Sequence, residues 1–402
     1  MSPASQTRSA SVGRLQASAF AGIFVFGIVM AVLGAILPSL FERIKIDKAE
    51  AGGLFLFMNF AMLVTSLFFG PIVDRFGFKL FLMTSSLLVV LSFGLLAFAS
   101  GYSTVIIAAV ILGLGGGGLN GGTNALTNDI NPGEQGSALN LLGIFFGFGA
   151  LTIPFLIGTL LEWGGLARIL GLAAIMGIVP FIMFATQGFP RPKQPQGFPL
   201  RDAKQIAGDP LLWLCAFILF FQSGNEFTIG GWISTYLQEG FRLKSAAASL
   251  VLAGYWALII AGRFAASRIV RRTGHNPLVL GSAVLSLAAA VLLVVAPAGG
   301  PAVAGVLLIG LGFAAIYPTT LATAGARFAS ISGTAFSLIF TVALCGGMLS
   351  PWLAGMIAKS STLRRGLLLP VVNCAMIVIL QIVLNRISKK TGPKPPEELG
   401  VT

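Results

Sequence analysis

Histidine is almost absent from this chain, and charged side chains of every kind are scarce. His275 is the single histidine, and the three cysteines, Cys215, Cys345 and Cys374, lack the spacing of metal ligands. Neither a zinc site nor a nucleophile–base pair can be assembled convincingly from this set. We therefore expect a protein that is not an enzyme and that holds no metal and no cofactor.

The shortage of charge also excludes a water-soluble globular protein. Only 10% of the 402 residues are charged, whereas 56% are hydrophobic. Windows of about 20 apolar residues, the length of a membrane-crossing helix, fit the sequence twelve times. The predicted spans are residues 17–40, 50–73, 79–99, 104–128, 137–161, 166–187, 211–237, 246–270, 277–296, 302–324, 333–357 and 366–387. The predicted fold class is an all-α membrane protein with twelve transmembrane helices.

The sequence matches itself after a shift of 197 residues. The pairs related by this offset include Gly77 and Gly274, Gly113 and Gly310, Gly115 and Gly312, Pro154 and Pro351, and Gly158 and Gly355. Glycine and proline set backbone conformation, so a chain path is repeated and not only a composition. We predict two six-helix bundles, residues 1–187 and 210–402, joined by a proline-rich cytoplasmic linker at residues 188–209.

The Lys and Arg residues predict the orientation in the membrane. Sixteen of those in the loops fall on the side of the two termini and nine fall on the other side, which favours cytoplasmic termini in a multi-pass protein of the cell membrane. These charges are scattered over two faces and form no single basic stripe, so we expect no nucleic-acid partner. The expected partners are the lipid bilayer and a small-molecule substrate, and the protein is expected to be a monomer.

One loop motif resembles a known family. The segment Gly70-x-x-x-Asp74-Arg75-x-Gly77-x-Lys79, with a degenerate copy at residues 267–274, is similar to the loop 2–3 signature of the major facilitator superfamily. The resemblance implies alternating access between two bundles, with a gating latch at this loop. The residues assigned to the latch are Gly70, Asp74, Arg75, Gly77, Lys79, Arg271 and Arg272. The alternative is that these are ordinary charges at the membrane surface.

A narrower resemblance concerns the fucose, galactose and glucose symporter branch of that superfamily. Residues 113–124, 136–149, 224–232 and 312–318 are similar to segments of fucose-permease-like and glucose-transporter-like proteins, which implies sugar transport by symport. Proton-coupled members similar to the fucose permease carry acidic residues in spans one and four. Here span one has none, and Asn120 stands at the span-four position, so proton coupling by that route is not expected.

Asparagine side chains inside the first half predict a polar binding site. Asn59, Asn120, Asn124 and Asn140 fall within predicted spans, where an amide needs a partner or a water-filled cavity. Asn120 and Asn124 are one helical turn apart and so share a face. An amide both donates and accepts, as a hydroxyl does, which favours a monosaccharide or another neutral polyol as the substrate. The alternative for each amide is a hydrogen bond to a neighbouring helix.

Aromatic residues occupy equivalent positions in the second half. The offset of 197 places Trp256 opposite Asn59 and Tyr317 opposite Asn120, which suggests rings on one wall of a sugar site and amides on the other. Packing between helices is the alternative for both rings. Trp232 is either a gate residue or part of an interfacial aromatic belt.

A single acidic residue, Glu226, lies deep within a predicted span. Asn225 is beside it and Gln222 is one turn earlier, so these residues form a polar patch that could bind substrate hydroxyls. An intramembrane carboxylate is a candidate coupling residue, with H⁺ or Na⁺ as the candidate ion. Arg263 is the one cation placed well inside a span, and it is either an ion-pair partner of Glu226 or an anchor for an anionic substrate.

Transport of a monosaccharide or neutral polyol, secondary active through Glu226 or facilitative, is the leading interpretation. Export of lipophilic or cationic drugs is an alternative, although no acidic residue lies deep within the spans of the first half. Transport of small organic anions anchored by Arg263 is another. A receptor with this fold that transports nothing is the alternative from a different class, and the short loops leave it little signalling surface.

Overall fold

The computed structural model describes residues 3–132, 135–189, 207–328 and 332–390, and every regular element in these ranges is a helix. The side chains of some helical residues, among them those of Asp74 and Asn140, also lie outside the described part. The helices are α1 (Pro3–Ile44), α2 (Lys48–Phe98), α3 (Tyr102–Ile130), α4 (Gln135–Thr186), α6 (Pro210–Phe241), α7 (Ser245–Thr273), α8 (His275–Val295), α9 (Gly299–Arg327), α10 (Ser332–Ser360), α11 (Leu363–Gly366) and α12 (Leu368–Lys390).

Two of these helices, α2 and α4, each contain two membrane crossings. They run for 51 and 52 residues, or roughly 75 Å of helix, which is more than twice the hydrocarbon core of a bilayer. Each is interrupted by one glycine in the left-handed region, Gly77 with φ 80° and Gly165 with φ 66°, a backbone conformation that glycine adopts without strain. Eleven described segments are long and apolar enough to cross a membrane, and one of them, residues 141–186, contains the break at Gly165. Counted as two crossings, this segment brings the total among the described residues to twelve, the number predicted from the sequence.

The backbone repeats at the offset read from the sequence. Gly274 has φ 81°, as Gly77 has φ 80°. The two described non-glycine residues with positive φ, Lys45 at 52° and Arg242 at 56°, are also 197 residues apart. Helix packing repeats as well. A Cβ added at Gly113 would overlap the carbonyl oxygen of Met58, and one added at Gly310 would overlap that of Tyr255, which is again 197 residues further on. These described features are therefore built in the same way in both halves.

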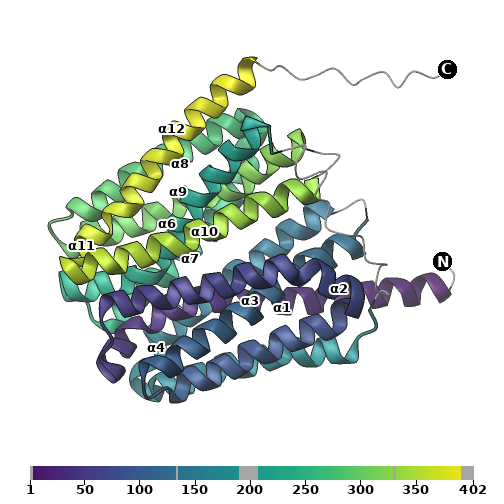
Figure 1. Ribbon diagram of the computed structural model, residues 1–402, viewed down its shortest axis with the longest axis horizontal. Coiled ribbons are helices and arrows are strands. Elements are labelled where there is room, and N and C mark those ends of the chain that lie inside the picture. The colour runs from purple at the N-terminus through teal and green to yellow at the C-terminus, as the bar shows by residue number, and fades with distance from the viewer. Residues whose placement is uncertain (1–2, 133–134, 190–206, 329–331, 391–402) are drawn as a thin grey trace.

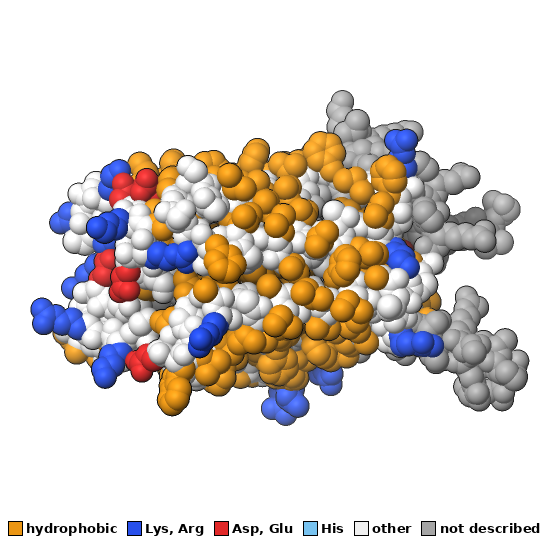
Figure 2. Space-filling view, turned by 90° about the horizontal axis from the view of Figure 1, so that it is seen from below, with side chains coloured by type: hydrophobic (Ala, Val, Ile, Leu, Met, Phe, Trp, Pro, Cys, Tyr) orange, Lys and Arg blue, Asp and Glu red, His pale blue; other side chains and the backbone are white. Residues whose placement is uncertain are grey.

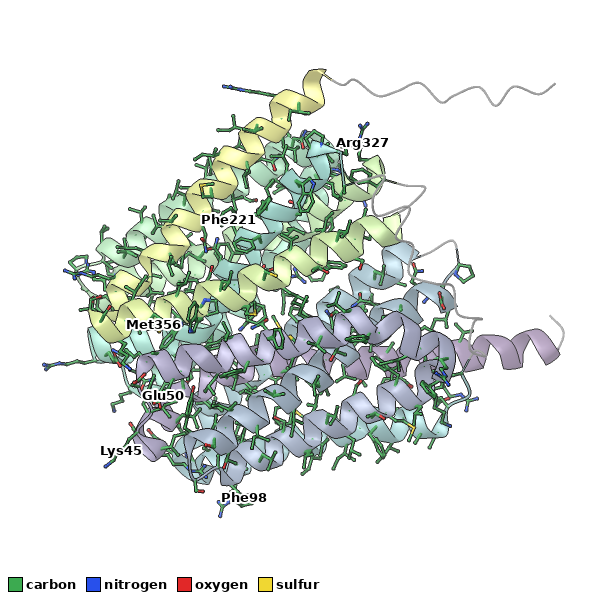
Figure 3. All side chains as sticks on the ribbon, viewed as in Figure 1. Lys45, Glu50, Phe98, Phe221, Arg327 and Met356 are labelled. Carbon is green, nitrogen blue, oxygen red and sulfur yellow. The ribbon has the colours of Figure 1, made fainter. Side chains whose placement is uncertain are left out.

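The helices form two bundles that lie side by side (Figure 1), α1 to α4 in one and α6 to α12 in the other. A broad apolar belt separates two charged ends (Figure 2), as expected of a membrane protein. Lys45 and Glu50 lie at one end and Arg327 at the other (Figure 3). We call the first the Asp47 end and the second the Gly77 end; the charge bias predicts that the Gly77 end is cytoplasmic.

The two bundles touch through glycine-lined helix crossings. The helices α1 and α6, α2 and α10, and α4 and α7 are in contact. At Gly34 in α1 an added Cβ would overlap the carbonyl oxygen of Gly230 in α6, and at Gly355 in α10 it would overlap that of Lys48 in α2. Such close approach is possible because glycine has no side chain. The crossings toward the Asp47 end are therefore backbone against backbone.

Candidate functional site

A glutamate of α6 and an arginine of α7 interact with each other in the second bundle. The Gln222 amide donates to Glu226 Oε1 at 2.9 Å, one helical turn along α6. Arg263 in α7 is near enough to Glu226 for a direct electrostatic interaction. The described hydrogen-bond partner of the carboxylate is thus Gln222, and Arg263 acts on it through space.

Arg263 reaches across to the first bundle. Its Nη1 donates to the carbonyl oxygen of Gly143 in α4 at 3.4 Å, and its guanidinium lies 5.9 Å from the centroid of the Phe146 ring. The Nε–H is buried and has no hydrogen-bond partner among the described residues. A guanidinium has five N–H donors in a fixed fork, so most of the donor capacity of Arg263 has no partner among the described residues at the interface between the bundles.

Aromatic rings surround these charges. Trp256 packs edge-on against Phe146 at 6.2 Å and against Tyr255 at 5.2 Å. The Trp256 indole N–H and the Tyr255 hydroxyl are buried without partners in the part of the chain that the structure describes. Tyr317 in α9 interacts electrostatically with both Glu226 and Arg263. Buried polar groups of this kind are normally satisfied by a ligand or by water, so their grouping marks a candidate binding site.

The asparagine side chains that were predicted to line the site have separate hydrogen-bond partners. The Asn124 amide donates to the Asn120 carbonyl at 2.8 Å and to Asn120 Oδ1 at 3.1 Å, so the two share a face as predicted. Asn59 donates to the Phe55 carbonyl within its own helix at 2.9 Å. Asn225 donates to the Cys374 sulfur at 3.3 Å. The predicted site residue Asn140 lies in α4, but its side chain is outside the described residues.

The structure therefore gathers only part of the predicted set. Its electrostatic contacts, hydrogen bonds and ring contacts connect Gln222, Glu226, Trp256, Arg263 and Tyr317. No described hydrogen bond links Asn59, Asn120, Asn124 or Asn225 to that group. The sequence did not assign Gly143, Phe146 or Tyr255 to the site. Residues 136–149 resemble the symporter branch as a segment but give no role to a single side chain, and a tyrosine inside a span carries no distinctive pattern.

Trp232 is buried between the bundles. It is 0% exposed, its indole N–H donates to the Pro351 carbonyl at 3.0 Å, and its ring lies 6.3 Å from that of Phe55 in α2. A residue of an interfacial belt would face the lipid headgroups, so that alternative is wrong. A role for Trp232 as a gate stays a prediction.

The described contacts of the predicted latch residues do not cross from one bundle to the other. Gly77 forms the break in α2, Arg75 lies 5.3 Å from the centroid of the adjacent Phe76 ring, and Lys79 donates to the Gln187 carbonyl at 3.3 Å. Arg271 and Arg272 are exposed in the last turn of α7. Asp74 and Gly70 lie in α2 with their side-chain surroundings outside the described residues, so the latch prediction remains open.

Two ion pairs join the bundles at the Asp47 end, and no sequence pattern predicts them. Lys48 Nζ lies 2.6 Å from Glu239 Oε2, and Lys359 Nζ lies 2.8 Å from Asp47 Oδ2. Asp47 also caps α2 reciprocally with Glu50, at 2.9 and 2.8 Å. The hydrogen bond from Lys359, and then the backbone N–H of Glu50, hold the pKa of Asp47 below its ordinary value. At the Gly77 end the described ion pair, Arg327 with Asp209, stays within the second bundle.

The arrangement defines a class of protein. Two equivalent helical bundles in a membrane enclose a charged aromatic site at their interface, and contacts between the bundles close one end, which is the architecture of an alternating-access transporter. The sequence model of the Major Facilitator Superfamily matches residues 19–351, and the chain belongs to this superfamily.

Similarity to individual proteins supports the superfamily and not the narrower sugar branch. The chain is 21% identical over 370 residues to an uncharacterised transporter of Sinorhizobium fredii, covering 91% of this chain and 97% of that protein. It is 26% identical over 351 residues to a probable sulfoacetate transporter of Cupriavidus necator, covering 79% and 80%. The crystal structure of a D-xylose–proton symporter matches with a TM-score of 0.78 and 15% identity, covering 93% of this chain and 97% of the other, which shows a shared fold.

Proposed function

We propose that this secondary transporter of the major facilitator superfamily carries a small organic anion whose acidic group binds Arg263. The observation that carries the proposal is a guanidinium at the interface of the bundles with donors that have no partner within the described residues. Its one described hydrogen bond, of 3.4 Å, goes to a neutral carbonyl. A planar carboxylate or sulfonate fits the fork of a guanidinium with two parallel hydrogen bonds. The similarity to a probable sulfoacetate transporter supports the same substrate class.

Glu226 supplies the charge balance in this proposal. In the absence of substrate its carboxylate offsets the charge of Arg263, with which it interacts electrostatically. When an anion binds Arg263, the site holds two negative groups and one positive group. A proton or a sodium ion taken up at Glu226 restores neutrality, which a low-dielectric site strongly favours. We therefore assign coupling to Glu226.

The transport cycle follows from where the contacts lie. Arg263 belongs to the second bundle, whereas Gly143 and Phe146 belong to the first. A substrate bound between them touches both bundles, so separating the bundles at one end or the other exposes it to one side of the membrane. The contacts at the Asp47 end hold that side closed in the described state.

The test is a substrate panel on purified protein, read as the change in melting temperature. We expect small carboxylates or sulfonates to stabilise the protein, and monosaccharides and lipophilic cations to leave it unchanged. Arg263→Gln removes the charged fork and should weaken anion binding by about ten- to hundredfold, while Arg263→Lys, which keeps the charge, should weaken it less. Stabilisation by a monosaccharide and by no anion would overturn the proposal.

A neutral polyol is the second candidate, and one observation favours it. The amide oxygens of Asn59, Gln222 and Asn225 are buried without partners within the described ranges, and each can accept a hydrogen bond from a hydroxyl. A sugar that stabilises the wild-type protein and also the Arg263→Gln variant would establish this candidate. A cationic drug is disfavoured because the central arginine repels it.

A further inference from the structure

We propose that the transported anion is aromatic, with a flat ring that binds on Tyr317 and Phe340 while its acidic group binds Arg263. The inference rests on the proposed function and narrows the substrate class. It adds Phe340, which the sequence motifs do not assign to the site, to the predicted site residue Tyr317. The geometry that carries it is a pair of nearly parallel rings next to the charged centre.

One ring of the pair is coupled to the charged centre. Tyr317 interacts electrostatically with Arg263 and Glu226, so it belongs to the same cluster. Phe340 in α10 lies 6.4 Å from Tyr317, centroid to centroid, with 12° between the ring planes. The Phe340 side chain is 38% exposed and Tyr317 is only partly buried. Phe340 therefore has uncovered ring surface and stacks on Tyr317, which is coupled to a cation with donors that have no partner among the described residues.

Aromatic rings also lie on the other side of the guanidinium. Arg263 lies over the Phe146 ring, which meets Trp256 edge-on. An aliphatic acid would gain little from such surroundings beyond burial of its chain. A flat ring instead gains offset stacking or edge-to-face contact, and an aromatic pair is worth about two- to tenfold in affinity beyond its buried area.

Two unpartnered donors add a specificity element. The Tyr255 hydroxyl and the Trp256 indole N–H are both buried, at 0% and 1% exposure, and both lack partners among the described residues. They come from successive residues of α7, the helix that also carries Arg263. An oxygen substituent on the ring would satisfy one of them. Ring acids that carry a hydroxyl are therefore expected to bind more tightly than the bare ring acid.

The experiment compares three probes on the full-length protein in lipid nanodiscs: benzoate, cyclohexanecarboxylate and benzyl alcohol. The two acids have the same charge and similar size, and only one of them has a π face. We expect benzoate to bind about five times more tightly than cyclohexanecarboxylate. Phe340→Leu should remove that difference, Phe340→Tyr should retain it, and benzyl alcohol should bind at least tenfold more weakly than benzoate because it lacks the acid.

A matched control variant exists in the neighbouring ring. Phe336 lies 6.2 Å from Phe340 on the same helix but is not part of the stacked pair with Tyr317, so Phe336→Leu should leave the preference for benzoate intact. Equal affinity for the two acids, or a preference that survives Phe340→Leu, overturns the aromatic inference and leaves the anion proposal standing. Binding of benzyl alcohol as tight as that of benzoate overturns both.

Discussion

Arg263 and Glu226 lie on adjacent helices of one bundle, yet each takes its described hydrogen bond elsewhere. Arg263 donates to Gly143 of the other bundle, and Glu226 accepts from Gln222. A closed buried ion pair is difficult to separate once formed. Because this pair interacts through space without closing, an incoming anion can bind Arg263 without first breaking a strong bond.

Replacing the carboxylate of Glu226 should separate coupling from transport. The variant Glu226→Gln keeps the size and the hydrogen-bonding ability of the side chain but takes up neither a proton nor a cation. We expect exchange of labelled for unlabelled substrate across proteoliposomes to continue, and accumulation driven by a proton or sodium gradient to disappear. The measurement is uptake with and without each imposed gradient.

Gln222→Leu serves as the control for this variant. It removes the amide that donates to Glu226 at 2.9 Å but leaves the carboxylate in place, so gradient-driven accumulation should persist with altered affinity. If Glu226→Gln accumulates substrate as the wild type does, Glu226 is not part of the ion pathway.

The sequence identifies the charged residues of the site better than the aromatic residues that surround them. Glu226 and Arg263 stand out because an ionisable residue within a membrane span is rare. The sequence does not indicate which of the 32 phenylalanines contacts Arg263. The contact of Phe146 depends on how α4 packs against α7. For the asparagines the sequence predicts site contacts that the described structure does not have. Asn120 and Asn124 share a face as predicted, but they are hydrogen-bonded to each other and not to the charged cluster.

At the scale of helices, one crossing between the bundles depends on the absence of a side chain. Gly34 in α1 meets the backbone of Gly230 and Gly231 in α6. A methyl group there would force α1 and α6 apart, and no flexible side chain can move to relieve the overlap. The substitution Gly34→Ala should therefore disfavour closure of the bundles at the Asp47 end.

Distances between spin labels can measure this effect. Labels at Lys45→Cys and Arg242→Cys lie on exposed positions of the two bundles, with Cys345 removed because it is only partly buried. We expect Gly34→Ala to shift the distribution to longer distances and to raise the exchange rate of substrate from the Asp47 side. An unchanged distribution would show that the crossing does not hold this end closed.

Gly149→Ala is the matched comparison. Gly149 meets the carbonyl oxygen of Phe24, but both residues belong to the first bundle. Overpacking there should lower the free energy of unfolding, by about 1–3 kcal/mol, without lengthening the distance between bundles. The two glycine variants thus separate an effect on conformation from an effect on stability.

Helix existence followed from the sequence, and helix boundaries largely did as well. The breaks at Gly77 and Gly165 fall between predicted spans, because a glycine with positive φ is the least strained way to turn a long apolar run. The crossings themselves could not be predicted. They depend on which glycine of one bundle faces which carbonyl of the other, and chain spacing carries no information on that.

At the scale of the whole molecule, ion pairs contribute to the choice between open and closed ends. Lys48 and Glu239 join α2 to α6 at 2.6 Å. Exposed pairs of this kind contribute about 1 kcal/mol at most, which is enough to change a two-state ratio about fivefold. The substitution E239K turns this attraction into repulsion.

The charge swap gives a clear prediction. E239K alone should shift the spin-label distances toward the state open at the Asp47 end, and K48E combined with E239K should restore the wild-type distribution because the pair is re-formed with opposite polarity. High salt should reduce both effects. Failure of the double variant to recover would mean that Lys48 and Glu239 act on the equilibrium separately.

Acid should open the same end. The pKa of Asp47 is held low by Lys359 and then by the backbone of Glu50, so its carboxylate stabilises the closed end at pH values above the ordinary carboxyl value of 3.8. That contribution is lost as the pH falls below this value through the lowered pKa. The share of Asp47 is measured as the difference between the wild type and a variant that lacks this carboxylate.

Asp47→Asn isolates that share. Asparagine caps a helix as well as aspartate does, but it carries no charge for Lys359. We expect the variant to be partly open at neutral pH and to respond less to acid than the wild type, when both are followed by spin-label distances between pH 7 and pH 3. Identical acid responses would show that other carboxyl groups control this end.

The hydrogen bond from Arg263 to Gly143 would escape detection by side-chain mutagenesis. It ends on a backbone oxygen, and a Cβ added at position 143 would lie 3.6 Å from the guanidinium, in ordinary contact. Small substitutions at that position leave the acceptor in place. A mutational scan would therefore record position 143 as tolerant although the contact there joins the two bundles. Only a change to the peptide bond itself, such as an ester substitution at the following residue that weakens the carbonyl acceptor, would reveal the importance of that oxygen.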